Sequence, residues 1–208
     1  MAMILLQTPG GLLGRLPEDF QQGFRLLVFF LALLWALEIV DLLLRGALNS
    51  FGIRPRQLKG IPGIVLAPLL HGDLKHLAAN TGPLAILGTL ILLNGLRSFL
   101  LVTAVVWLVS GVGVWLVGRN NTNHLGASGL VFGYLGFLLL RGYFVQSPVA
   151  IAVAVLVGFL YSGALWGLLP LRQGRSWTGH LFGFLGGVLA ARYLTNLLHW
   201  WGSWTPTS

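Results

Sequence analysis

Two short motifs place a hydroxyl and an imidazole at the start of separate apolar segments. Residues 126–129 read Gly-Ala-Ser-Gly and open one apolar segment, and Gly179-His180 opens another. A serine hydroxyl is a weak nucleophile until an adjacent base takes its proton, and a histidine can be that base. Ser128 and His180 are therefore the candidate nucleophile and general base of a hydrolase.

More polar residues share these segment ends. His71 and His76 stand at the start of one apolar segment, with Asn80 four residues after His76 on the same helix face, and His124 precedes Ser128. If the segments cross a membrane in alternating directions, the even-numbered ones all start at one face. The topology then brings these groups together with His180, and polar groups inside a bilayer are costly and usually functional.

Composition narrows the class of protein. The chain is 56% hydrophobic and 9% charged, with mean hydropathy +0.82, whereas soluble domains carry about 25% charged residues. We expect an all-α, multi-pass membrane protein in contact with the lipid bilayer and without a second large domain. The net charge of +8 comes from basic residues scattered between apolar runs, which fits bilayer headgroups rather than nucleic acid.

Several chemistries are excluded by the residues present. The chain has no cysteine, no His-Glu-x-x-His motif and no phosphate-binding loop, and its last acidic residue is Asp73. A pair of aspartates inside membrane helices is not available either. We expect no metal and no cofactor, and a Ser128–His180 dyad rather than a triad, since a third, orienting carboxylate is nearly unavailable.

Six apolar segments are long enough, or nearly so, to span a bilayer. We expect an N-terminal cytoplasmic segment without a cleaved signal peptide over residues 1–22, a membrane domain over 23–201 and a tail over 202–208. The predicted spans are 23–44, 76–96, 98–117, 127–140, 148–169 and 178–200.

The fourth predicted span is the short one. Residues 127–140 would make a helix of about 21 Å, against a hydrocarbon core of about 30 Å, with Arg141-Gly142 at its far end. The loop 119–124 should then dip inward, and a hydrated cavity should lead to Ser128. The alternatives are a helix extended by loop residues and a locally thinned bilayer.

Glycines follow both candidate catalytic residues at helical spacing. Gly129 and Gly133 follow Ser128, and Gly183 and Gly187 follow His180. Small residues at a spacing of four let helix backbones approach closely. Two such stripes facing each other can bring the serine and the histidine within hydrogen-bond reach.

A negative charge that develops on a substrate carbonyl needs hydrogen-bond donors that are already in place. The amide of Asn80, the ring of His76 and the backbone N–H of Ser128 at a helix N-terminus are suited to that task.

Three motifs, in order, resemble those of the rhomboid intramembrane serine proteases. They are His71-xxxx-His76-xxx-Asn80, Gly126-Ala127-Ser128-Gly129 and His180-xx-Gly183-xxx-Gly187, and the similarity covers most of the chain, from about His71 to Ala191. Each motif alone is weak evidence, but together and on the matching spans they are highly specific.

The resemblance implies a six-transmembrane-helix bundle whose fourth helix carries Ser128 as nucleophile, with His180 as base and with His76 and Asn80 as oxyanion donors. It also implies a partly embedded loop after the first span, and lateral entry of substrate at the fifth span and the loop before His180. Transmembrane segments of membrane proteins would be the substrates. The supporting residues would be His71, Gly126, Gly129, Phe132, Gly183 and Gly187.

Two positions depart from the family pattern. Phe132 stands where many members have a tyrosine, so stacking on the histidine survives and a hydroxyl is lost. Pro62-Gly63 stand where many members have Trp-Arg, nine positions before His71, which puts the structure of the first loop in question.

The orientation in the membrane is a point of conflict. Basic residues number eight on the Ser128 side (Arg45, Arg54, Arg56, Lys59, Lys75, Arg119, Arg172, Arg175) and five on the other (Arg15, Arg25, Arg97, Arg141, Arg192). That count places the Ser128 side in the cytoplasm. The resemblance implies instead a plasma (inner) membrane protein whose active site opens to the extracytoplasmic side, and we adopt this expectation.

Two other functions stay open at this point. One is a catalytically silent rhomboid-like protein that binds transmembrane helices. The other is a channel, transporter or metal-binding membrane protein that uses neutral imidazoles, drawn from His71, His76, His124 and His180. The second leaves Asn80 and Ser128 unexplained.

Overall fold

The computed structural model describes residues 16–170 and 176–204, and the chain is helical nearly throughout this part. Among these residues the extended backbone forms one isolated antiparallel bridge, between Ile53 and His124. The predicted all-α fold is confirmed. The α-helices are α1 (Glu18–Leu43), α2 (Gly63–Leu66), α3 (Leu74–Leu92), α4 (Leu96–Val117), α5 (Ser128–Val145), α6 (Pro148–Tyr161) and α7 (Trp177–Trp204). The 3₁₀ helices are η2 (Ala47–Phe51), η3 (Leu58–Gly60), η4 (Ala67–Leu69) and η5 (Ser162–Leu168).

Within the part of the chain that the structure describes, five helical stretches are long and apolar enough to cross a membrane, so the chain is a multi-pass membrane protein. They are α1, α4, α5, the continuous stretch Pro148–Leu168 made of α6 and η5, and α7. The helix α3 has 19 residues, but its first turns carry Lys75, His76 and Asn80, which lower its apolarity. The count of six spans therefore stays a prediction.

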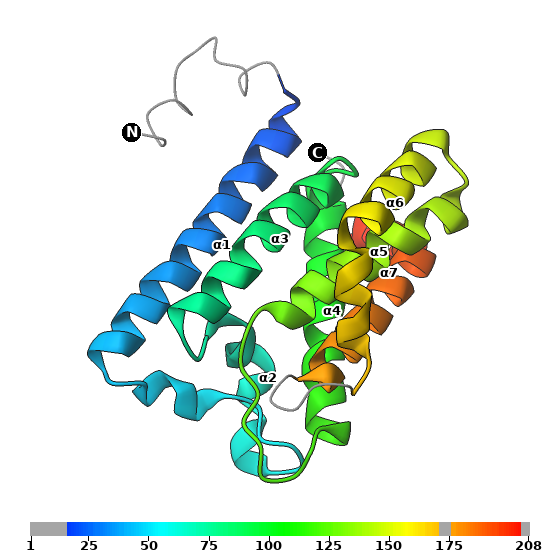
Figure 1. The fold of residues 1–208 in the computed structure, drawn as a ribbon. Helices are drawn as coiled ribbons and strands as arrows, with labels where there is room; N and C mark the ends of the chain where they lie inside the picture. Colours follow the sequence, from blue (N-terminus) through cyan, green and yellow to red (C-terminus); the bar gives the residue numbers. More distant parts are fainter. Residues whose placement is uncertain (1–15, 171–175, 205–208) are drawn as a thin grey trace.

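Helix α5 lies at the centre of the bundle. It packs against α3, α4, α6 and α7, and 56% of its most apolar stretch is buried, against 6% for Pro148–Leu168. Figure 1 shows that α5 begins at mid-height in the bundle, reached by a loop that climbs from the end of α4. The predicted inward course of the loop before Ser128 agrees with this arrangement.

The predicted 14-residue length of the fourth span is wrong, because α5 has 18 residues and continues past Arg141 to Val145. The sequence predicts Arg141 at an interface, but its side chain is half-buried and donates to the carbonyl of Ala191 on α7 at 3.1 Å. The helix therefore continues past this arginine. Gly142 leaves room for the first turn of α6, where a Cβ would lie 2.9 Å from the Ala150 carbonyl oxygen. The inward position of Ser128 thus comes from the loop before α5.

That loop is held by the segment between α1 and α3. Ile53 and His124 exchange two backbone hydrogen bonds of 2.9 and 3.0 Å. The guanidinium of Arg56 donates to the carbonyls of Leu116 and Gly118 at 2.7 Å each, and so binds the free carbonyls at the C-terminal end of α4.

Gly63 is one of the two residues that stand where many rhomboid proteases have Trp-Arg, and it packs against the backbone of the first loop. A Cβ there would sit 2.5 Å from backbone atoms of Gly52 and Ile53. Glycine therefore permits α2 to pack against the strand-like segment that pairs with the loop before Ser128. The first loop is built on close backbone contact at this position, while Arg56 supplies a guanidinium that binds α4.

Candidate functional site

The two glycine stripes lie against each other along the contact of α5 with α7. A Cβ on Gly183 would overlap the backbone of Gly129, and a Cβ on Gly187 would overlap the Gly133 carbonyl oxygen and lie 2.7 Å from the Phe137 nitrogen. Because backbone meets backbone here, no flexible side chain can adjust the distance between the two helices. This contact sets how closely the starts of α5 and α7 approach.

Ser128 and His180 meet at this junction. The hydroxyl of Ser128, the first residue of α5, lies 3.1 Å from Nε2 of His180 in the first turn of α7. His180 is 8% exposed, while Ser128 is half-buried. A serine hydroxyl within hydrogen-bond reach of a buried imidazole is the arrangement that nucleophilic catalysis requires.

The second nitrogen and one face of the His180 ring are also held in place. Its Nδ1 lies 3.0 Å from the carbonyl oxygen of Gly167 in η5, and its ring stacks on Phe132 with centroids 4.0 Å apart and planes 10° from parallel. A carbonyl can only accept, so Nδ1 carries the proton in this bond and the lone pair of neutral His180 is on Nε2, facing Ser128.

A second imidazole, that of His71, supports the turn before Ser128. Gly126 has a φ of +111°, which favours glycine, and its N–H donates to the Ala67 carbonyl at 2.9 Å. The next N–H, of Ala127, donates to Nε2 of His71 at 3.3 Å. Burial, followed by the nearby His76, lowers the pKa of His71 from 6.5 to about 4, so His71 stays a neutral acceptor near neutral pH.

His76 and Asn80 lie one helical turn apart near this turn. A Cβ on Gly126 would sit 2.6 Å from Cε1 of His76, so the imidazole lies directly over that glycine. Asn80 is 6% exposed, and its Nδ2 is buried without a hydrogen-bond partner in the part of the chain that the structure describes. A buried amide donor without an acceptor is costly and calls for an explanation.

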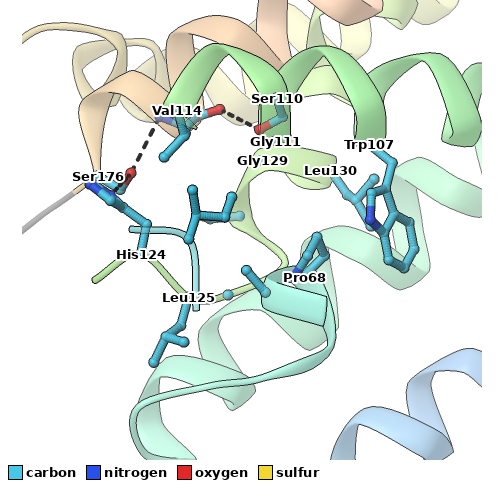
Figure 2. Close-up of a pocket in the computed structure, with 15 residues that line it drawn as sticks. Pro68, Trp107, Ser110, Gly111, Val114, His124, Leu125, Gly129, Leu130 and Ser176 are labelled. Atoms are coloured by element: carbon cyan, nitrogen blue, oxygen red, sulfur yellow. Dashed lines mark hydrogen bonds between the residues drawn. The ribbon is translucent and has the colours of Figure 1, made fainter. Parts of the chain in front are cut away.

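A small cavity borders Ser128 on the side of α4. Its volume of about 30 Å³ is enough for one or two water molecules. Figure 2 shows Trp107, Ser110 and Val114 of α4 on one side of it, with His124 and Leu125 of the loop opposite. A small, partly open space therefore lies beside Ser128, where the sequence predicts a cavity, and its hydration stays a prediction.

Sequence reasoning missed two contacts that position the catalytic residues. The Gly167 carbonyl is a backbone atom, so no residue type announces it. Ser110 donates from α4 to the carbonyl of Gly179 at 3.1 Å (Figure 2), and one buried serine in an apolar helix is too common a feature to single out.

The metal-binding alternative finds no support among the residues described, and some other predictions fall on residues that the structure does not describe. No group of three histidine or acidic side chains that could hold a metal ion occurs in residues 16–170 and 176–204. Most of the loop before His180, with Arg172 and Arg175, lies outside the described residues, as do Arg15 and parts of both predicted terminal segments.

Comparison with known proteins agrees with this fold. The family profile described as Rhomboid domain matches residues 59–197, which is more than half of the chain and includes all three motifs. The chain belongs to the rhomboid family, a family of intramembrane proteases.

Mycobacterial proteins are similar along most of their length. An uncharacterized protein of Mycobacterium bovis is 43% identical over 181 residues, covering 83% of this chain and 75% of the relative. An uncharacterized protein of Mycobacterium tuberculosis has the same values. One of Mycobacterium leprae is 41% identical over 206 residues, covering 92% of this chain and 82% of the relative.

Proposed function

We propose that this rhomboid protein is an intramembrane serine endopeptidase that cleaves transmembrane segments with a Ser128–His180 dyad. The observation that carries the proposal is the 3.1 Å approach of the Ser128 hydroxyl to Nε2 of His180, whose Nδ1–H is held by the Gly167 carbonyl. This is the protonation pattern that a general base needs before it accepts a proton.

In the first half of the reaction, Ser128 Oγ attacks the carbonyl carbon of the scissile peptide bond while Nε2 of His180 takes the hydroxyl proton. A tetrahedral intermediate forms, with its negative charge on the former carbonyl oxygen. His180 then gives the proton to the departing amine, which leaves an acyl ester on Ser128. The backbone carbonyl of Gly167 takes the orienting position that a carboxylate holds in a triad.

Donors for the developing oxyanion are available beside the serine. The N–H of Ser128 lies in the first turn of α5, where backbone N–H groups have no acceptor within the helix. We assign the buried Nδ2 of Asn80 and the ring of His76 as the other donors. An oxyanion would give the Asn80 amide the acceptor it otherwise lacks, and such preorganised donors contribute a large part of catalysis.

In the second half of the reaction a water attacks the acyl ester. His180 takes a proton from that water and returns it to Ser128 Oγ as the ester breaks. The cavity beside Ser128 has room for such a water. The products are two peptides, one with a new carboxylate and one with a new amine.

The substrates we propose are transmembrane segments with small or helix-destabilising residues near the cleavage site. A helical backbone keeps its carbonyls in internal hydrogen bonds, so a scissile carbonyl must leave the helix before Ser128 can attack it. We further propose lateral entry beside α6 and η5, where only 6% of the apolar stretch is buried.

The placement in the cell is also a proposal. We place the protein in the plasma (inner) membrane with Ser128 opening to the extracytoplasmic side, as the family resemblance implies. Residues 1–22 form a cytoplasmic segment, 23–201 the membrane domain and 202–208 the tail.

The direct test uses the purified protein in lipid vesicles, a model transmembrane substrate and a fluorophosphonate probe. The unsubstituted protein should cleave the substrate and be labelled on Ser128, and Ser128→Ala should lose both while its thermal unfolding is unchanged. Cleavage by Ser128→Ala at the original rate would falsify the proposal. A catalytically silent protein that only binds transmembrane helices would take up no probe.

A further inference from the structure

His124, four residues before Ser128, contacts Ser176, four residues before His180. Nδ1 of His124 lies 2.7 Å from the Ser176 hydroxyl, and its Nε2 lies 2.7 Å from the Thr122 hydroxyl. The Ser176 hydroxyl also accepts a hydrogen bond from the N–H of Gly179 at 3.3 Å. The backbone carbonyl of Ser176 accepts one from the N–H of His180 at 3.2 Å. This contact, the His124–Ser176 bridge, links the loop that leads to the nucleophile with the turn that carries the base.

The partners fix the direction of each hydrogen bond. The Thr122 hydroxyl donates its one proton to the Arg119 carbonyl at 2.5 Å, so it accepts from His124 and Nε2 carries a proton. Nδ1 of neutral His124 is then the acceptor, and Ser176 donates to it. The hydroxyls of Thr122 and Ser176 thus each donate one hydrogen bond and accept another.

Both ends of the bridge are attached to rigid structure. The backbone of His124 is paired with Ile53, and Gly179, whose carbonyl accepts from Ser110 of α4, directly precedes His180 in the chain. The first turn of α7 is therefore held from the loop by Ser176 and from α4 by Ser110. Loss of the loop contact would leave that turn held from α4 alone, and so with more freedom to move relative to Ser128.

Resting on the function proposed above, we propose that His124 is a positioning residue which, through Ser176, keeps His180 in register with Ser128, and that protonation of His124 releases this contact. A proton on Nδ1 removes the acceptor of the Ser176 hydroxyl. The hydroxyl must then either leave the contact or rotate to accept from Nδ1, which takes its own hydrogen away from that acceptor. We expect the first turn of α7 to lose its present attachment to the loop, and the nucleophile and base to lose their alignment.

The surroundings of His124 favour its neutral form. Burial lowers the pKa of His124 below its ordinary value. Among the described residues, the charged or titratable side chains nearest to His124 along the surrounding segments are Arg54 and Arg56 beside Ile53, Arg119 of its own loop and His180 of α7. No carboxylate occurs on those segments, and Arg175, next to Ser176 in the sequence, lies outside the described residues. The bridge is therefore intact at neutral pH and is lost as the medium becomes acidic.

The experiment compares His124→Ala with His124→Asn in vesicles, measuring kcat and KM for a transmembrane substrate between about pH 8 and about pH 5. The Asn Oδ1 can take the place of Nδ1 as acceptor but cannot be protonated. At neutral pH we expect His124→Ala to lower kcat roughly tenfold or more with KM unchanged, and His124→Asn to stay within about twofold.

The pH profile separates positioning from a structural role. The acid limb of kcat should reflect protonation of both His124 and His180 in the unsubstituted protein. In His124→Asn it should reflect protonation of His180 alone, so this variant should stay active at lower pH. Ser176→Ala removes the same contact from the other side, together with the acceptor of the Gly179 N–H, and should lower kcat at least as much as His124→Ala, which keeps the test valid if one variant folds poorly. The controls His199→Ala and Ser50→Ala alter exposed residues and should leave kcat unchanged.

Two results would overturn the inference. One is a His124→Ala profile that coincides with that of the unsubstituted protein. The other is equal loss in His124→Asn and His124→Ala, because the imidazole would then act otherwise than as an acceptor for Ser176. Neither result touches the proposed function, which depends on whether Ser128 is labelled and needed for cleavage.

Discussion

At the scale of single residues, the environment of His180 explains how a dyad can work without a carboxylate. An imidazole needs something to hold its second nitrogen so that the correct tautomer faces the serine. Here that group is the carbonyl of Gly167, and the stack on Phe132 fixes the plane of the ring. The hydroxyl lost by having Phe132 in place of tyrosine is not needed for this stack.

Gly167 offers a direct test of this arrangement. A Cβ there would lie 2.8 Å from Cζ of Phe132 and 3.3 Å from Nδ1 of His180, so Gly167→Ala should push η5 away from the imidazole. We expect kcat to fall by roughly tenfold or more, since small misplacements of catalytic groups cost that much. The measurement is substrate cleavage together with the rate of fluorophosphonate labelling.

The matched control for Gly167→Ala lies in the same 3₁₀ helix. Nothing is within 4 Å of a Cβ built on Gly163, so Gly163→Ala should cleave at the original rate. Normal kinetics in Gly167→Ala would mean that the carbonyl does not orient His180 during turnover.

At the scale of helices, α5 and α7 behave as one unit. Their glycine stripes put backbone against backbone directly below Ser128 and His180. The separation of the two helices along this contact is therefore set by backbone packing, while the contacts at the starts of the helices position the catalytic side chains themselves.

Gly187→Ala tests this packing. The new methyl would overlap the Gly133 carbonyl and the Phe137 nitrogen, neither of which can move alone. Overpacking of this kind costs about 1–3 kcal/mol or more, so the thermal unfolding temperature and the cleavage rate should both fall. A thermal unfolding scan in detergent, followed by an activity assay, measures the two effects.

A glycine inside α3 provides the contrast. A Cβ on Gly82 would meet nothing within 4 Å, so Gly82→Ala should be neutral or stabilise the helix by about 0.5–1 kcal/mol. Equal unfolding temperatures for Gly187→Ala and Gly82→Ala would contradict the backbone-contact interpretation.

The parts of the site that depend on residue type could be predicted from the sequence, and the parts that depend on backbone contacts could not. The approach of Ser128 to His180 could be predicted, because two glycine stripes at a spacing of four have few uses other than close helix contact. The length of α5 could not, since Arg141 resembles an interfacial residue until its bond to the Ala191 carbonyl is seen. The contact of His180 with the Gly167 carbonyl and the His124–Ser176 bridge could not be predicted either, because they depend on which segments of the backbone meet.

At the scale of the whole molecule, both ends of the described chain lie at the face opposite the loop segment between α1 and α3 (Figure 1). The arginines of that segment are one source of the conflict over orientation. Arg56 is engaged with the carbonyls at the end of α4, so it serves the fold as well as adding to the count of basic residues.

Single cysteines can decide the orientation, because the chain has none of its own. Ser50 is exposed near the Ser128 face, and Asn94 is exposed in the turn between α3 and α4 at the other face. In intact cells an impermeant maleimide should label Ser50→Cys and should reach Asn94→Cys only after the membrane is opened. The reverse pattern would place the Ser128 side in the cytoplasm, as the count of basic residues predicts.

The start of α5 in mid-bundle has an electrical consequence. The aligned peptide dipoles of a helix leave a partial positive charge at its N-terminus, and here that end lies in mid-bundle, on a helix that packs against four others (Figure 1). Dissolved ions screen buried charges far less than exposed ones. The field that acts on Ser128 should therefore depend less on the salt in the surrounding solution than the field at an exposed helix end.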